Sequence, residues 1–260
     1  MSHVNIYGHP PFLTAVLHGG PGAAGELAPV ARTLGQRYGV VEALQTAQSI
    51  DGQVEELFKT LTSTGEPPMV LIGHSWGAWL GYIFASQHPQ FVRKLILVGA
   101  GPFEEHFTSA LSETRLSRMS EHERLEFKEL QKSMAGAAPY ERRQKFARMG
   151  ELLSKADSYD LLPSKSEAID YQPEIYDQVW PEAAVLRRSG DLLRMGEKIR
   201  CPVVAIHGDY DPHPADGVRT PLSKILHDFR FVLLDRCGHT PWLERYAQQR
   251  FFEILCEEAA

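Results

Sequence analysis

Cysteine is scarce in this sequence. Its 260 residues include three, Cys201, Cys237 and Cys256, and no two of them have the Cys-x-x-Cys spacing found in zinc sites and redox motifs. We therefore expect neither a metal site nor a disulfide framework. Thiols without such partners are typical of a reducing compartment, so the expected location is the cytoplasm.

Long apolar runs and basic tracts are missing too. No apolar stretch approaches the roughly 18 residues needed to cross a bilayer, and residues 1–12 lack the basic and apolar regions of a signal peptide. The net charge is −6, with no basic tract to offset it. We therefore expect no membrane association and no nucleic-acid partner.

What the sequence does contain is a series of short apolar runs separated by helical patterns. The composition, 43% hydrophobic and 23% charged residues, is ordinary for a globular protein. Strands that are apolar throughout and alternate with helices indicate a mostly parallel sheet with helices on both faces. We predict an α/β fold with six or seven strands, at Leu13–Leu17, Val40–Leu44, Met69–Ile72, Leu95–Val98, Pro202–Ile206 and Arg230–Leu234, with Val4–Tyr7 as a possible short edge strand.

The alternation breaks after Gly99. About a hundred residues separate this point from the next clear strand, whereas a crossover between parallel strands needs only a dozen or more. The intervening stretch is charged and has helical spacing. We predict a helical cap, residues 102–189, inserted into a core made of residues 1–101 and 190–260. Helices are expected at Ser112–Ser133, Pro139–Lys155, Ser166–Gln178 and Ala183–Lys198.

One motif organises the rest of the chain. The run Gly73-His74-Ser75-Trp76-Gly77 follows a short apolar strand and precedes a helical pattern, and Gly-x-Ser-x-Gly between a strand and a helix is the signature of a nucleophile elbow. The serine of such a turn has strained backbone, and side chains at the two glycines would collide with the neighbouring strand and helix. The start of the helix also places positive partial charge near Ser75. We predict that Ser75 is a nucleophile.

A serine hydroxyl is a weak nucleophile that needs a base, and the base needs an orienting acid. The loop after the strand that ends at Ile206 contains Asp209 and Asp211, and the loop after the strand that ends at Leu234 contains His239. A serine, an aspartate and a histidine thus follow three strands in this order. We predict His239 as the base. Asp211 is the expected acid, and Asp209 is expected to form a turn.

A second loop, His18-Gly19-Gly20-Pro21-Gly22, follows the strand that ends at Leu17. Its glycines leave backbone N–H groups free and allow a ligand to approach closely, although a plain turn would have the same composition.

Together these motifs resemble the α/β-hydrolase superfamily, over nearly the whole chain except the cap. More narrowly, the HGGPG loop with Trp76 after Ser75 resembles the proline-iminopeptidase-like branch, although the elbow reads GHSWG where that branch more often has GGSWG. The resemblance implies an oxyanion hole formed by the backbone N–H groups of Gly20 (or Gly19) and Trp76. It also implies a structural role for Glu244, in the pattern Gly238-His239-Thr240-Pro241-Trp242-Leu243-Glu244.

The expected function is that of a serine hydrolase that cleaves an ester or amide bond of a small molecule through a Ser-His-Asp triad and an acyl-enzyme. This mechanism implies no metal and no organic cofactor. Two alternatives stay open: an aminopeptidase like the proline iminopeptidases, and a non-catalytic binding protein with a hydrolase fold.

The cap contains one acidic and aromatic stretch, Ser166–Leu186, without lysine or arginine. Carboxylates above an active site can bind a free α-amino group while aromatic rings cover the rest of the ligand. Glu174, Glu182 and Trp180 are therefore candidate substrate-binding residues. The alternative is an amphipathic helix whose acids, Glu167, Asp170, Glu174, Asp177 and Glu182, face water while its aromatic residues pack on the core.

Overall fold

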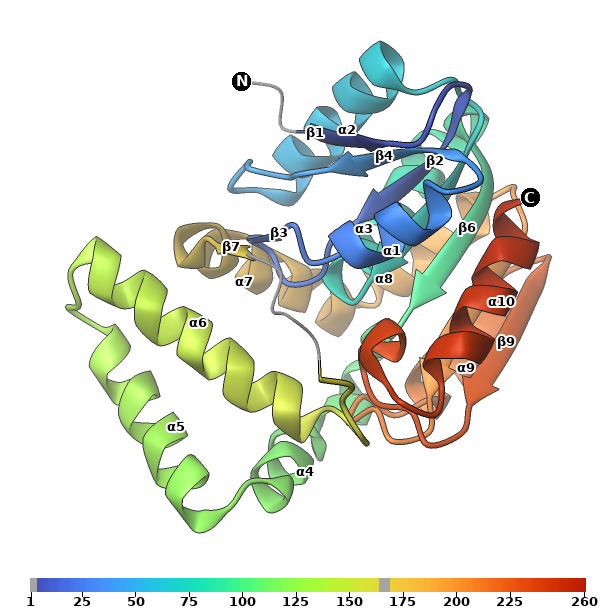
Figure 1. The fold of residues 1–260 in the computed structure, drawn as a ribbon. Helices are drawn as coiled ribbons and strands as arrows, with labels where there is room; N and C mark the ends of the chain where they lie inside the picture. Colours follow the sequence, from blue (N-terminus) through green and yellow to red (C-terminus); the bar gives the residue numbers. More distant parts are fainter. Residues whose placement is uncertain (1–3, 164–168) are drawn as a thin grey trace.

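The computed structural model describes residues 4–163 and 169–260. Seven strands form one sheet in the order β1, β4, β2, β5, β6, β8, β9 (Figure 1). Strand β1 is antiparallel to β4, and every other neighbouring pair in this sheet is parallel. The predicted mostly parallel sheet of six or seven strands is confirmed. The strands are β1 Val4–Tyr7, β2 Phe12–Leu17, β4 Gly39–Ala43, β5 Met69–His74, β6 Val92–Val98, β8 Val203–Gly208 and β9 Phe229–Leu234.

Helices cover both faces of the sheet, as predicted. Because successive side chains of a strand point to opposite faces, Leu71 and Ile72 of β5 belong to two different hydrophobic clusters. On the side of Leu71 lie α2 (Ile50–Thr64), α3 (Trp76–Gln87) and α9 (Asp216–Ile225). On the side of Ile72 lie α1 (Ala28–Leu34) and α10 (Gln248–Ala259).

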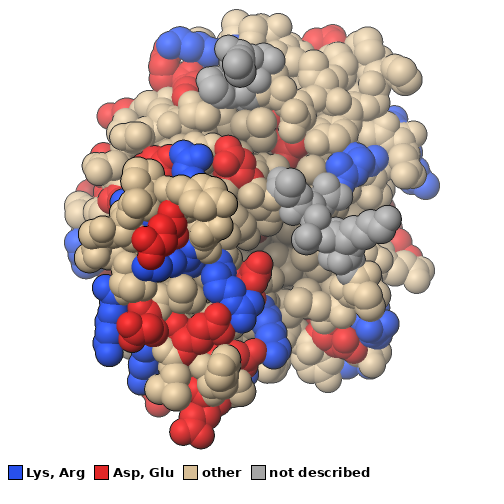
Figure 2. All heavy atoms as spheres, turned by 60° about the vertical axis from the view of Figure 1, so that its left-hand side comes forward, with Lys and Arg blue, Asp and Glu red and all other residues tan. Residues whose placement is uncertain are grey.

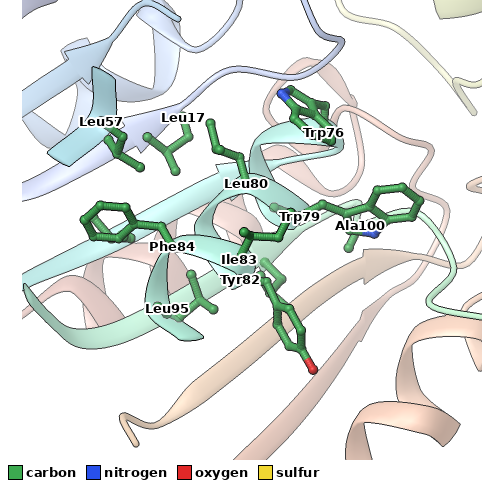
Figure 3. Packing of buried hydrophobic residues seen from close by; sticks show 14 of the residues in the cluster. Leu17, Leu57, Trp76, Trp79, Leu80, Tyr82, Ile83, Phe84, Leu95 and Ala100 are labelled. Carbon is green, nitrogen blue, oxygen red and sulfur yellow. The ribbon is translucent and has the colours of Figure 1, made fainter. Parts of the chain in front are cut away.

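The helix that follows the elbow, α3, is buried from Trp76 to Ser86. A helix that is apolar all round belongs inside a protein, and Figure 3 shows its side chains packed among Leu57 of α2, Leu17 of β2 and Leu95 of β6. Ser75 is therefore attached to one of the most firmly packed elements of the molecule.

The chain between β6 and β8 is largely helical. It forms η2 (Glu105–Thr108), α4 (Leu111–Arg118), α5 (Glu121–Met134), α6 (Pro139–Ala156) and α7 (Pro173–Ser189). Figure 1 shows α4, α5 and α6 projecting away from the sheet. Helices α5 and α6 have a small core of their own around Phe127 and Leu152. In contrast, Ile175, Val179 and Ala183 of α7 belong to the main core.

Three predicted helices were wrong in extent. The stretch predicted as Ser112–Ser133 forms two helices, α4 and α5, separated by the extended residues Met119 and Ser120. The stretch predicted as Ser166–Gln178 contains a short strand, β7 (Asp170–Tyr171), which pairs with β3 (Ala23–Ala24) beside the HGGPG loop. The helix starts only at Pro173, whose ring fixes a helical φ angle and whose missing N–H is not needed there. Residues 166–168, including Glu167, lie outside the described residues.

The predicted helix Ala183–Lys198 is also divided. Helix α7 ends at Ser189. The capping residue Gly190 has a left-handed φ of +77° and is followed by α8 (Asp191–Arg194) and η3 (Met195–Lys198). In the part of the chain that the structure describes, no helix has the length and hydropathy of a membrane span.

Candidate active site

Ser75 has the strained backbone expected of the elbow, with φ of +51° and ψ of −112°. A Cβ atom at Gly73 would lie 2.2 Å from the Gly77 carbonyl oxygen, and one at Gly77 would lie 2.2 Å from the carbonyl oxygen of Leu17. Such distances are far inside van der Waals contact, so both positions require glycine. The predicted reason for the Gly-x-Ser-x-Gly pattern is confirmed by this geometry.

The structure brings Asp211 to His239 and keeps Asp209 away. His239 Nδ1 donates a hydrogen bond of 2.7 Å to Asp211 Oδ2. Asp209 is exposed, and its Oδ1 accepts the backbone N–H of Cys237 at 3.0 Å. Asp209 therefore braces the loop before His239, and Asp211 is the carboxylate that can orient the imidazole.

The Asp211 side chain is fully buried and lies beside three histidines, two of which the sequence reasoning missed. The backbone N–H and Nδ1 of His213 both donate to Asp211 Oδ1, at 2.9 and 2.8 Å. His207 Nε2 lies 3.6 Å from Asp211 Oδ2. The sequence held a signal for both residues, since His207 near the end of β8 and His213 in the following loop lie within four residues of Asp211.

These contacts determine the charges of the site. Burial by itself would raise the pKa of the Asp211 carboxyl, but the three histidines hold it well below its ordinary value. Burial lowers the pKa of His213 to about 4, so this ring is neutral at pH 7. For His239 burial also opposes the charged form, yet the Asp211 carboxylate outweighs it and the pKa is raised. The imidazolium that forms when His239 accepts a proton is thus stabilised.

Ser75 and His239 line one cavity of about 570 Å³ between the sheet and the cap. Within the described residues the Ser75 hydroxyl makes no hydrogen bond, and catalytic hydrogen bonds of unliganded enzymes often tighten only when substrate binds. Most of the wall is apolar and comes from both the cap and the core, including Phe146, Leu153, Leu162, Ile169, Trp242 and Phe252.

The structure distinguishes between the candidate N–H donors of the oxyanion hole. The Gly19 N–H donates a 2.7 Å hydrogen bond to Glu26 Oε2, so it is already engaged. Gly20 lines the cavity beside Ser75. Trp76 is the first residue of α3, where backbone N–H groups have no partner within the helix. Gly20 and Trp76 are therefore the candidate donors that remain, and Gly19 has another role.

The three candidate residues of the cap are engaged outside this cavity. Glu174 pairs with Arg143 on the surface. Glu182 accepts the backbone N–H of Ile50, at the start of α2, at 2.9 Å. Trp180 stacks on Trp79, with ring centroids 5.8 Å apart. None of the three is among the described residues that line the cavity.

Glu244 has a structural environment, as the resemblance implied. Its buried carboxylate accepts the backbone N–H groups of Gly238, Tyr159 and Asp160 at 2.8 to 2.9 Å. The backbone N–H of His239 donates to the carbonyl oxygen of Asp157 at 2.9 Å. The loop that carries His239 is therefore tied to the chain segment that follows α6 in the cap.

Three of these groups also satisfy the spacing of a metal site. The ligand atoms of Asp211, His213 and His239 lie within 4.8 Å of one another. However, each imidazole donates Nδ1–H to the carboxylate. A metal ion bound there would have to replace the hydrogen bond that orients His239.

We expect Cys237→Ala to keep most of the activity of this site. The side chain is buried, its pKa is raised by burial and then by nearby carboxylates, and it does not line the cavity. The measurement is kcat for hydrolysis of an activated ester by the purified variant. A fall of about a thousandfold with an intact fold, close to the loss of a catalytic group, would contradict this prediction.

A family model described as "Alpha/beta hydrolase family" matches residues 8–253 of the chain. No curated protein sequence matches it significantly. Similar solved structures include VinJ, at 18% identity and a TM-score of 0.69 over 98% of this chain and 93% of that one. A monoacylglycerol lipase of Paleococcus ferrophilus is 15% identical, with a TM-score of 0.61 over 98% and 96% of the two chains. A proline iminopeptidase of Mycobacterium smegmatis is 16% identical, with a TM-score of 0.61 over 98% and 92%. At these identities the likeness establishes a common fold.

Proposed function

The chain belongs to the alpha/beta hydrolase family and is a hydrolase, and we propose that it is a serine hydrolase that cleaves esters of small apolar acyl groups. The observation that carries this proposal is the placing of Ser75 and His239 on one largely apolar cavity, with Asp211 hydrogen-bonded to His239. Ligand sites of this volume and character are typical of small-molecule enzymes.

The proposed mechanism uses groups of this chain alone. His239 takes the proton of the Ser75 hydroxyl as the oxygen attacks the acyl carbon, and Asp211 stabilises the resulting imidazolium. The backbone N–H groups of Gly20 and Trp76 bind the developing oxyanion, at about 3–4 kcal/mol for each donor. His239 then protonates the leaving alcohol. A water molecule, deprotonated by His239, hydrolyses the acyl-enzyme and releases the acid.

The charges around the cavity favour an uncharged acyl group over a free amine. Two carboxylates, Glu26 and Asp157, are among the described residues that line the cavity. Both already have partners: Glu26 accepts from His74 at 3.0 Å, and Asp157 accepts from Arg115 at 2.8 Å. Figure 2 shows acidic and basic side chains interspersed over one face of the molecule, without a large area of one sign. These observations support an esterase over an aminopeptidase like the proline iminopeptidases.

A series of activated esters with acyl chains of increasing length tests this proposal. Because each buried CH₂ contributes about 0.8 kcal/mol, kcat/KM should rise about threefold to fourfold for each added carbon until the cavity is full. Phe146→Ala, on the cavity wall, should weaken this dependence. Tyr140→Ala is the matched control, since Tyr140 lies on the same helix and is 75% exposed.

An aminoacyl naphthylamide and its N-acetylated twin complete the test. An apolar acyl site should accept the acetylated compound at least as well as the free amine. A preference for the free amine of about tenfold or more in kcat/KM would contradict the esterase proposal and favour the aminopeptidase.

A further inference from the structure

Two titratable side chains beside Ser75 take no part in the mechanism described above. His74 directly precedes Ser75 and is buried, and Glu26 follows the HGGPG loop with 20% of its side chain exposed. One carboxylate oxygen, Glu26 Oε2, accepts both the Gly19 N–H at 2.7 Å and His74 Nδ1–H at 3.0 Å. On the other side of the ring, His74 Nε2 lies 3.0 Å from the backbone carbonyl oxygen of His239.

Hydrogen-bond donors and acceptors determine the charge of this pair. A carbonyl oxygen can only accept, so His74 Nε2 carries a hydrogen. His74 Nδ1 faces the carboxyl group of Glu26, and one of these two groups holds the proton between them. Burial would raise the pKa of Glu26, but His74 and the Gly19 N–H lower it to about 2. Glu26 is therefore a carboxylate, which can only accept, so a hydrogen on Nδ1 of His74 in addition to the one on Nε2 would complete an ion pair.

Glu26 and His74 leave no free space around Gly19 of the HGGPG loop. A Cβ atom at Gly19 would lie 2.5 Å from Glu26 Oε2, 2.7 Å from His74 Nδ1 and 3.2 Å from the Cβ atom of Ser75. Gly19 is thus packed directly against Glu26, His74 and the nucleophile. The next peptide N–H along the chain is that of Gly20, the proposed oxyanion donor.

We propose that Glu26 and His74 form a buried ion pair that positions the oxyanion loop and the catalytic base relative to Ser75. Glu26 holds the loop through Gly19, and His74 holds the His239 loop through its backbone carbonyl. The two residues are positioning residues, since neither acts on the reacting atoms. This inference rests on the proposed function, because it assigns a task in the same reaction.

Three variants test the ion pair through kcat and KM for an activated ester. In Glu26→Gln the amide is uncharged and cannot stabilise a doubly protonated His74. His74→Phe keeps a ring against His239 and Trp242, whose centroids both lie 4.7 Å away, but removes both donors. Each change should lower kcat about tenfold to a hundredfold and leave KM within about threefold, since misplaced groups affect the transition state more than substrate binding.

The double variant should lose about as much as the worse single variant, because both changes break one network. Losses that multiply, or losses confined to KM, would overturn the proposal. Glu56→Gln is the matched control. Like Glu26, Glu56 accepts backbone N–H groups of a loop that follows a strand, in this case those of Thr46 and Ala47 at 2.9 Å, but it does not line the cavity. This variant should keep the kcat of the wild-type protein.

Nitrogen NMR of the His74 side chain tests the ion pair without a measurement of catalysis. Both ring nitrogens should be protonated at pH 7 in the wild-type protein, and only one in Glu26→Gln. A neutral His74 in an active wild-type protein would overturn the ion pair alone. An inert wild-type protein with a doubly protonated His74 would instead overturn the proposed function, and with it the catalytic task of the pair.

Discussion

Ser75→Ala is expected to lower kcat for an activated ester by about a millionfold, the loss seen when a serine hydrolase loses its nucleophile. The physical reason is that the elbow presents one hydroxyl to the cavity, at a strained φ of +51° that the surrounding packing maintains. Without this oxygen no acyl-enzyme can form. The residual rate comes from the oxyanion donors and from substrate binding.

Labelling with a fluorophosphonate provides a second measurement of the same residue. The probe should attach to the wild-type protein and fail to attach to Ser75→Ala. Ser86→Ala is the matched control, because Ser86 lies in the helix that follows the elbow and its hydroxyl donates to the Ile83 carbonyl oxygen, outside the cavity. A folded wild-type protein that neither labels nor hydrolyses any ester would favour the non-catalytic binding protein.

Asp211→Asn should lower kcat by about ten-thousandfold, as expected when the acid of a Ser-His-Asp triad is neutralised. The carboxylate accepts Nδ1–H of His239 at 2.7 Å and so directs the other ring nitrogen toward the serine. An asparagine can present an NH₂ group there, which favours the wrong tautomer. Asp209→Asn is the matched control, because its amide oxygen can still accept the N–H of Cys237. A loss confined to the Asp209 variant would reverse the assignment.

The pH profile gives this prediction a second readout. A general base works when deprotonated, so kcat/KM should fall as the pH decreases through the pKa of His239. That pKa is raised because the Asp211 carboxylate outweighs the effect of burial. In the wild-type protein the acid limb should therefore lie above about 6.5, the ordinary value for histidine. In Asp211→Asn burial remains and the carboxylate is gone, so the limb should move to lower pH. If the acid limb of the pH profile did not shift in Asp211→Asn, a group other than His239 would be responsible for it.

Local patterns were enough to predict the elements that carry the site. Continuous apolar runs predicted the parallel strands, because strands buried on both faces need no alternation. The two glycines around Ser75 predicted the elbow, since each contacts backbone that lies within a short stretch or on a neighbouring strand. The cap was harder to predict: its charged helices have weaker patterns, and a stretch expected to be helical instead contains β7, which pairs with β3 across some 145 residues of chain.

The sequence by itself was enough to predict the fold class, the elbow, and the candidates for nucleophile, acid and base, because each of these depends on residues that lie close together after one strand. Only the tertiary structure decided how distant charges pair. It placed Glu26 next to His74. It also engaged the Gly19 N–H with Glu26, which left Gly20 as the candidate oxyanion donor of the loop. Glu174 and Glu182 found partners outside the cavity. The physical reason is that polar and charged groups pair with whatever partner lies near them in the folded chain, and local spacing in the sequence does not encode that proximity.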